Sequence, residues 1–173
     1  MTTEHKVFIG IGIATLVIIG GAIFFTSSQT GSSAKPLLGQ NVPISGRQHF
    51  PDGTKITYDT NPPAEGNHYP EPQDAGIYPT PPADGHLVHS LEHGAVILWY
   101  NPKMLSKDQI KQLTDIFNSI SLSKTIMTSR ESMDVPVAVT SWGRLLKLKT
   151  IDEKQIKAFF ETNYDRGPEQ API

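Results

Sequence analysis

The stretch LVHSLEHGAVILWYNP, residues 87–102, decides the fold of this 173-residue chain. Its second half, residues 95–100, is a continuous apolar run of strand length that ends at an Asn-Pro pair. Such a run is typical of a strand that is buried on both faces of a sheet. The chain before this strand is rich in loop residues, and the chain after it shows regular helix and strand patterns.

The regular half predicts two amphipathic helices. Ser106 and Gln109 form a capping box, and apolar residues recur at helical spacing as far as residue 120. Thr150 and Glu153 form a second capping box, ahead of a helix that closes at the Gly-Pro pair of residues 167–168. We therefore expect one helix to begin after Ser106 and the other after Thr150.

Two further segments are typical of strands. Residues 135–141 are mostly apolar, and Pro136 either places this strand at the edge of the sheet or marks the point where the chain joins it. Residues 55–60, KITYDT, alternate as a short strand. Seven prolines between residues 61 and 82 exclude a central strand there and indicate a long ordered loop. The prediction is a small single α+β domain with a short sheet and two amphipathic helices.

Composition excludes several classes of function. The 15 basic and 17 acidic residues give a net charge of −2, with no long block of one sign, which argues against nucleic acid as a partner. The absence of cysteine excludes disulfides, thiolate zinc sites and iron–sulfur clusters. No phosphate-binding loop and no serine-hydrolase elbow occurs in the sequence.

The N-terminal region predicts a membrane anchor. After a short flank, residues 1–6, the chain has 19 uncharged residues, 7–25, which as a helix reach about 28 Å, close to the hydrocarbon thickness of a bilayer. The small residues at 32–34 offer a cleavage site but lie well beyond this stretch, so we favour an uncleaved signal anchor. Residues 26–41 then form a flexible linker, and residues 42–173 an extracytoplasmic domain. The prediction is a single-pass protein of the cell membrane, held by the lipid bilayer, with its C-terminal domain outside the cytoplasm.

Histidines cluster in the loop-rich half. Five of the six lie within 45 residues: His49, His68, His86, His89 and His93. The last three lie in GHLVHSLEHG, which is either a helix capped by Asp84 and ended by Gly94, or a strand that continues into the apolar run. Both geometries place His89 and His93 on the same face.

Clustered neutral imidazoles favour a metal site, because each offers a nitrogen lone pair. Without thiolates, such a site suits zinc, copper(II), nickel or iron(II). We predict His68, His89 and His93 as ligands, with Glu92 as a ligand or orienting group, and we interpret His49 as structural. The alternative is a polar network in which the histidines only brace the loops.

Several strings then occur in a fixed order, namely PPAEGNHYP (62–70), GIYP (76–79), LVHSLEHGAVILWYNP (87–102), SWGR (141–144) and RGPE (166–169). In this order the chain resembles, over residues 42–169, a bacterial and archaeal membrane-anchored family, the domain of unknown function 3105. The family pattern, P-P-x-S-G-x-H-Y-P followed by H-x-L-E-H-G, falls on His68, His89, Glu92 and His93. Glu65 stands where the first motif usually has serine. The resemblance supports this choice of residues and leaves the reaction open.

Three hypotheses for the function follow. The preferred one is a membrane-anchored extracytoplasmic domain that binds a divalent metal, zinc or copper, through the histidine cluster. The second is a metal-dependent hydrolase in which Glu92 acts as general base to a bound water. The third is a non-catalytic envelope interaction module whose histidines are structural.

Overall fold

The predicted buried strand is β3 (Val96–Tyr100) of the computed structural model, which describes residues 36–173. All five of its residues are buried. It pairs in parallel with β4 (Thr125–Ser129) and antiparallel with β5 (Val137–Ser141). The prediction of a strand buried on both faces is therefore confirmed.

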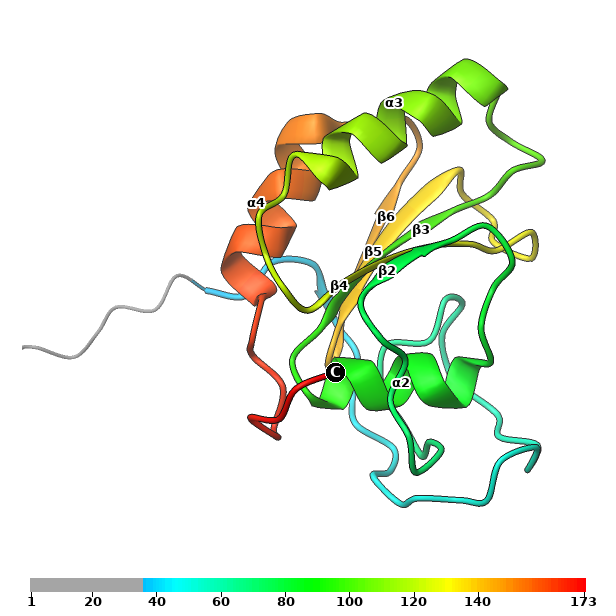
Figure 1. Ribbon diagram of the computed structural model, residues 1–173, viewed down its shortest axis with the longest axis vertical. Helices are drawn as coiled ribbons and strands as arrows, with labels where there is room; N and C mark the ends of the chain where they lie inside the picture. Colours follow the sequence, from blue (N-terminus) through cyan, green and yellow to red (C-terminus); the bar gives the residue numbers. More distant parts are fainter. Residues whose placement is uncertain (1–35) are drawn as a thin grey trace, which may run out of the picture. The chain divides into compact units, whose positions relative to one another are not determined.

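The sheet has six strands in the order β1-β6-β5-β3-β4-β2 (Figure 1). Strand β6 (Arg144–Leu148) forms an antiparallel hairpin with β5. The two edge strands, β1 (Gln40–Asn41) and β2 (Gly76–Tyr78), have only two and three residues. Because β5 lies between β3 and β6, Pro136 marks the point where the chain joins this strand and does not place it at an edge.

The strand predicted for residues 55–60 is wrong. No strand forms there, because the segment belongs to the long loops between β1 and β2. The Tyr58 hydroxyl donates a hydrogen bond to the Asn67 carbonyl oxygen in these loops, at 3.1 Å. The alternation in this segment comes from side chains that pack into the loops and not from strand pairing. A two-residue period over so short a segment does not separate these cases.

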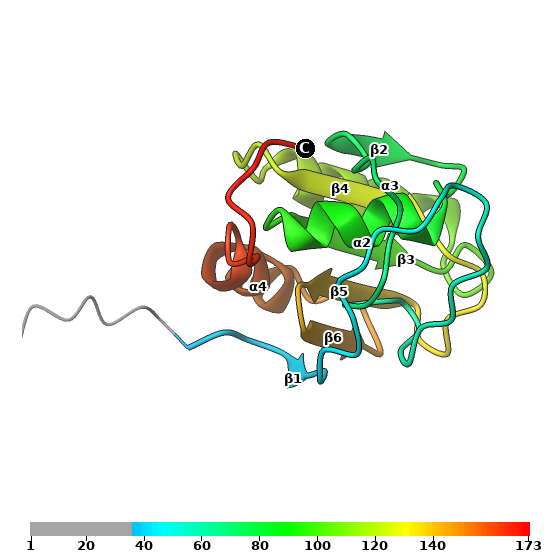
Figure 2. The ribbon, with the colours of Figure 1, turned by 90° about the horizontal axis from the view of Figure 1, so that it is seen from below.

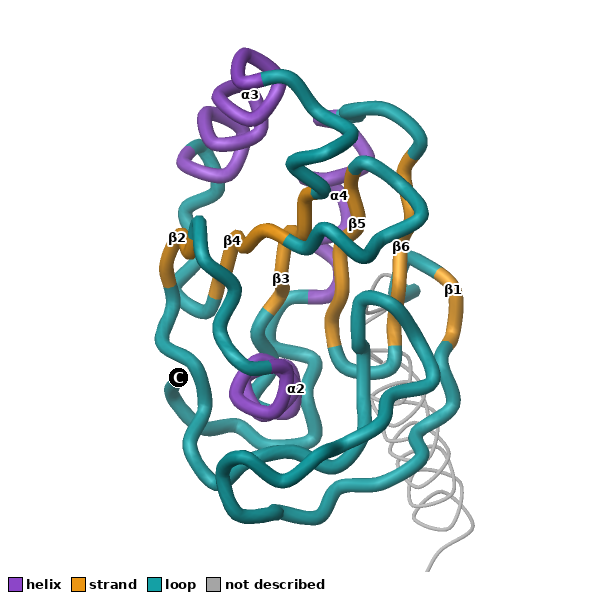
Figure 3. The backbone as a smooth tube through the Cα atoms, turned by 90° about the vertical axis from the view of Figure 1, so that its right-hand side faces the viewer, coloured by secondary structure: helices purple, strands orange, loops and turns teal. Residues whose placement is uncertain are grey.

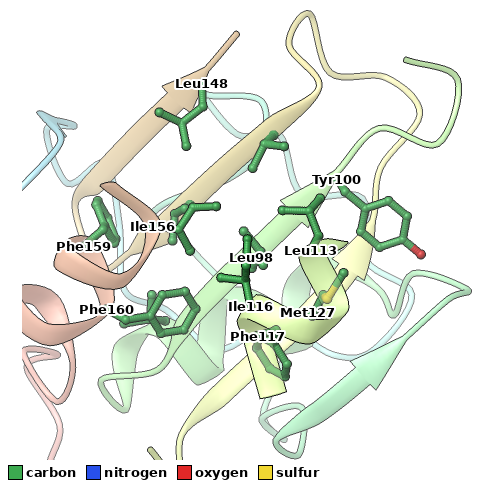
Figure 4. Close-up of a cluster of buried hydrophobic side chains, with 13 residues drawn as sticks. Leu98, Tyr100, Leu113, Ile116, Phe117, Met127, Leu148, Ile156, Phe159 and Phe160 are labelled. Carbon is green, nitrogen blue, oxygen red and sulfur yellow. The ribbon is translucent and has the colours of Figure 1, made fainter. Parts of the chain in front are cut away.

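Both predicted amphipathic helices are present on one face of the sheet, as α3 (Lys107–Asn118) and α4 (Glu153–Asn163). The capping box of Ser106 is confirmed, with both of its reciprocal hydrogen bonds formed. The capping box at Thr150 is wrong, because the carboxylate of Asp152 accepts from the Gln155 N–H at 3.0 Å and begins the helix two residues later. The apolar faces of α3 and α4 meet the sheet in one core (Figure 4).

A third helix, α2 (Asp84–Glu92), covers the opposite face of the sheet (Figure 2). The sequence left this segment open between helix and strand and predicted two helices in the domain, so the count within residues 36–173 is corrected to three. Gly94 ends the helix with φ +89°, as expected. Asp84 does not cap it, because both oxygens of its carboxylate accept from the guanidinium of Arg130, at 2.6 and 3.1 Å. Alternate residues of β3 pack toward α2 on one side and toward α3 and α4 on the other.

Long loops between β1 and β2, called the loop layer below, surround α2 on its outer side (Figure 3). Here His49 and His68 form an isolated β-bridge, with the Phe50 N–H donating to the His68 carbonyl oxygen at 2.8 Å. The loop layer is therefore ordered by main-chain hydrogen bonds, which fix where its histidines lie. Within residues 36–173, no helix combines the length and the apolarity needed to cross a bilayer. The predicted anchor, its flank and most of the predicted linker lie outside the described residues.

Candidate metal site

Helix α2 and the loop layer bring the three predicted histidine ligands together. His89 lies one helical turn before His93, the residue at the C-cap of α2. His68 reaches them from the loop that is bridged to His49. The ring centroids of His68 and His89 are 4.7 Å apart, and those of His89 and His93 are 4.5 Å apart. Residues far apart along the chain thus converge.

Each of the three rings is fixed through its Nδ1 atom. The acceptors are backbone carbonyl oxygens: Gly66 for His68 at 2.9 Å, Tyr69 for His89 at 2.7 Å, and Pro172 for His93 at 2.7 Å. A carbonyl oxygen can only accept, so each Nδ1 carries the proton. In a neutral ring the lone pair is then on Nε2. This is the tautomer and the support that histidine ligands of metals usually have.

The Nε2 atom of His68 faces a carboxylate and not a donor. It lies 2.9 Å from Oε2 of Glu92, and both side chains are almost completely buried, at 0% and 1% exposed. The two atoms are not aligned for a hydrogen bond, and neither has another partner among residues 36–173. Buried polar atoms are nearly always paired, so this contact calls either for a proton between the two atoms or for a cation that both can bind.

Four residues form the group that can hold an ion: His49, His68, His89 and Glu92. One ligand atom from each lies within 4.8 Å of the others. His49, which the sequence led us to interpret as structural, lies in this group, with its ring 4.6 Å from that of His68 and 4.8 Å from that of His89. His49 is exposed and forms the open side of the group.

His93 and His86 lie outside this group of four. The Nε2 atom of His93 is 3.0 Å from that of His89, so His93 borders the group. His86 turns away: its Nδ1 donates to the Glu71 carbonyl oxygen at 2.6 Å, and its Nε2 lies 3.3 Å from the carboxylate of Asp52. His86, His89 and His93 are spaced for one face of a helix, but only His89 and His93 lie at the group, and His86 is held away from it.

Sequence reasoning missed two charged residues next to the group. Arg47 donates from Nε to Oε1 of Glu92 at 2.6 Å and has its Nη2 3.6 Å from Oε1 of Glu169. Oε2 of Glu169 in turn lies 3.4 Å from Nε2 of His93. Arg47 and Glu169 come from opposite ends of the described chain, so no short-range sequence pattern indicates that they lie at the same site. The RGPE string that contains Glu169 was the one available signal.

Burial lowers the pKa of His89 from 6.5 to about 4. The hydrogen bond to the Tyr69 carbonyl oxygen opposes this shift, and the neighbouring His68, His93 and His49 add to it. His89 is therefore neutral at pH 7, with its lone pair available to a metal ion.

The metal-free protein is expected to lose stability in acid. The unfolded chain binds a proton at His89 near pH 6.5 and the folded chain only near pH 4, so the free energy of unfolding falls as the pH drops through this window. We expect a loss of about 2 kcal/mol, after allowance for water on the open side. Urea unfolding in chelator at pH 7 and pH 4 measures it.

His89→Asn, whose amide can still donate to the Tyr69 carbonyl oxygen, should show a smaller loss of stability between the two pH values. His86→Ala lies outside the group and should keep the full loss. An equal loss in wild type and His89→Asn would contradict the assignment.

The family model described as "Protein of unknown function (DUF3105)" matches residues 49–172, which include all the residues of the group. The chain belongs to the DUF3105 family. No curated protein and no solved structure matched the chain.

A second buried carboxylate lies in the loop layer. Glu65 is buried, and its carboxylate accepts from the N–H and the hydroxyl of Ser45, at 2.5 and 2.9 Å. Its polar atoms are thus satisfied within the loops, unlike Oε2 of Glu92.

Proposed function

We propose that this DUF3105 protein binds a divalent metal ion, zinc or copper(II), in a domain held outside the cytoplasmic membrane. The ligands are His68, His89 and Glu92, with His49 on the open side and His93 at the border of the group. The observation that carries the proposal is the unpaired contact between Nε2 of His68 and Oε2 of Glu92. A cation satisfies both atoms at once.

The alternative of purely structural histidines fits this contact less well. Bracing needs only one hydrogen bond from each ring, and the Nδ1 atoms already supply it. The Nε2 atoms would then be free to turn toward donors or water. Instead they meet one another and a carboxylate in a buried space, an arrangement that costs free energy unless a cation is bound.

The geometry also favours binding over hydrolysis. A general base must have an oxygen free to accept a proton from a bound water. Oε1 of Glu92 accepts from Arg47 at 2.6 Å, and in the proposed site Oε2, which faces His68, is a ligand of the ion, so neither oxygen is left to accept that proton. Glu92 is thus placed to ligate or to orient, which supports metal handling as the function.

The membrane part of the proposal rests on residues 7–25. Their length and lack of charge support a single-pass anchor, and the small polar residues that follow support a tether. The bilayer is then the partner of the N-terminal segment, and the metal site lies in the domain on the outer side. Such a site would meet metal ions before they enter the cell.

The experiment is metal analysis of the full chain by inductively coupled plasma mass spectrometry. The chain is expected in the membrane fraction, extracted by detergent and not by alkaline carbonate. Bound zinc or copper should fall in His68→Ala and in His89→Ala, and should disappear when both are combined. His86→Ala, on the same helix as His89 but outside the group, should keep the wild-type content. Equal metal content in all these variants would refute the proposal.

A further inference from the structure

The four-residue group leaves a second set of polar atoms unexplained. Nε2 of His93 lies 3.0 Å from Nε2 of His89 and 3.4 Å from Oε2 of Glu169. His89 and His93 are buried, at 4% and 8% exposed, whereas Glu169 lies at the rim. Two imidazoles and a carboxylate thus face one another on the side of α2 covered by the C-terminal segment, residues 165–173.

The contact between the two rings has no donor when both are neutral. Each Nδ1 already donates to a carbonyl oxygen, so each Nε2 presents a lone pair, and the two lone pairs meet at 3.0 Å. This contact differs from that of His68 and Glu92 at 2.9 Å in having the geometry of a hydrogen bond, which would form only if one ring carried a second proton. Repulsion of this kind is relieved by a cation held between the two atoms.

The spacing between the atoms also fits a coordination shell. With metal–ligand bonds of about 2.0–2.1 Å, neighbouring ligand atoms lie about 2.9 Å apart in an octahedron and about 3.4 Å apart in a tetrahedron. The observed separations of 2.9, 3.0 and 3.4 Å match these values. The side chains are thus already placed as neighbours around an ion.

One guanidinium lies beside both carboxylates, hydrogen-bonded to Glu92 and farther from Glu169. Arg47 holds Oε1 of Glu92 through Nε at 2.6 Å and approaches Oε1 of Glu169 through Nη2 at 3.6 Å. This leaves Oε2 of Glu92 facing His68 and Oε2 of Glu169 facing His93. Each carboxylate therefore offers one oxygen to Arg47 and the other to a histidine, and the arrangement occurs twice.

We infer that the site takes two divalent ions. With two ions, His89 is no longer a ligand of the same ion as His68 and Glu92. The inner ion is held by His49, His68 and Glu92, and the outer ion by His89, His93 and Glu169, so each has two imidazoles and one carboxylate. Ligands of this type select zinc(II), copper(II), nickel(II) or iron(II) over calcium and magnesium. This inference rests on the proposed function and adds the number of ions and the role of the C-terminal segment.

Binding of the outer ion ties the C-terminal segment to α2. The segment is joined there by the Glu169 N–H, which donates to the Glu92 carbonyl oxygen at 3.1 Å, and by the Pro172 carbonyl oxygen, which accepts from His93. Figure 1 shows its red end beside α2. A metal bond to the side chain of Glu169 adds a third tie, so the segment should become harder to displace when metal binds.

The test is a zinc titration of the full chain in detergent, followed by calorimetry and by metal analysis after gel filtration. Wild type is expected to bind two zinc ions. His93→Ala and Glu169→Gln are expected to bind one, and Glu161→Gln, an exposed carboxylate on α4, is expected to bind two. Copper(II) loading gives a second readout, because two adjacent copper ions couple magnetically in electron paramagnetic resonance and a single ion does not.

The outcomes separate the two proposals. One zinc ion in wild type, or two that persist in His93→Ala and Glu169→Gln, overturns the two-ion inference and leaves metal binding intact. No zinc in wild type overturns both. Because Glu169 is 43% exposed, Glu169→Gln is expected to fold, and circular dichroism of each variant checks this.

Discussion

Glu92→Gln should abolish tight metal binding while leaving the metal-free fold as stable as wild type, or slightly more stable. In the variant, the side-chain oxygen can keep the hydrogen bond from Arg47, and the new amide can donate to the lone pair on Nε2 of His68. The substitution thus supplies the missing donor and removes the negative ligand. We expect metal affinity to fall by about 100-fold or more.

The stability of the same variant distinguishes a metal site from an ion pair. If His68 and Glu92 were a structural salt bridge, loss of one charge would leave the other buried and cost about 3–5 kcal/mol. The expected result is instead an unchanged or higher melting temperature in chelator, measured by circular dichroism. Glu65→Gln is the matched control, since Glu65 is an equally buried carboxylate held by Ser45. Its metal content should not change, and a large loss of stability in Glu92→Gln would contradict our interpretation.

The parts of the fold that the sequence predicted are those governed by local patterns. The apolar run that became β3 and the helical spacing that became α3 need no knowledge of distant contacts. The start of α4 was misplaced because Thr150 and Asp152 both offer side-chain oxygens, and only the folded chain shows which one meets the Gln155 N–H. The wrong strand at residues 55–60 has the same cause, because a strand requires a partner that a single segment cannot reveal.

The residues of the candidate site also fall into those that a local pattern predicts and those that only long-range contacts bring together. His89, Glu92 and His93 are neighbours in sequence, so helical or strand geometry alone indicates that they gather. His49 joins them only through its β-bridge with His68, and Glu169 through a chain that returns from the far end of the domain. No periodicity connects such segments. Conversely, His86 has the right helical spacing, but the Glu71 carbonyl oxygen holds its ring elsewhere.

Gly167→Ala should produce the largest loss of stability among single substitutions in the C-terminal segment. A Cβ atom at this position would collide with the Glu92 carbonyl oxygen and the Gly94 nitrogen, which are backbone atoms that cannot move aside cheaply. The segment must therefore leave the end of α2 and lose the hydrogen bond between Glu169 and Glu92. We expect a cost of about 3 kcal/mol in metal-free protein, from overpacking and lost hydrogen bonds.

Thermal unfolding in chelator and limited trypsin digestion measure this effect. Arg166 is exposed and adjoins Gly167, so a displaced segment should be cut faster after Arg166 in the variant than in wild type. Gly53→Ala is the control, because Gly53 has φ +83° but nothing within 4 Å of an added Cβ, so it reports backbone strain alone, about 1 kcal/mol. Equal melting temperatures for the two variants would show that the segment is not held against α2. Zinc should slow cleavage of wild type more than of Gly167→Ala, because only a seated segment brings Glu169 to His93.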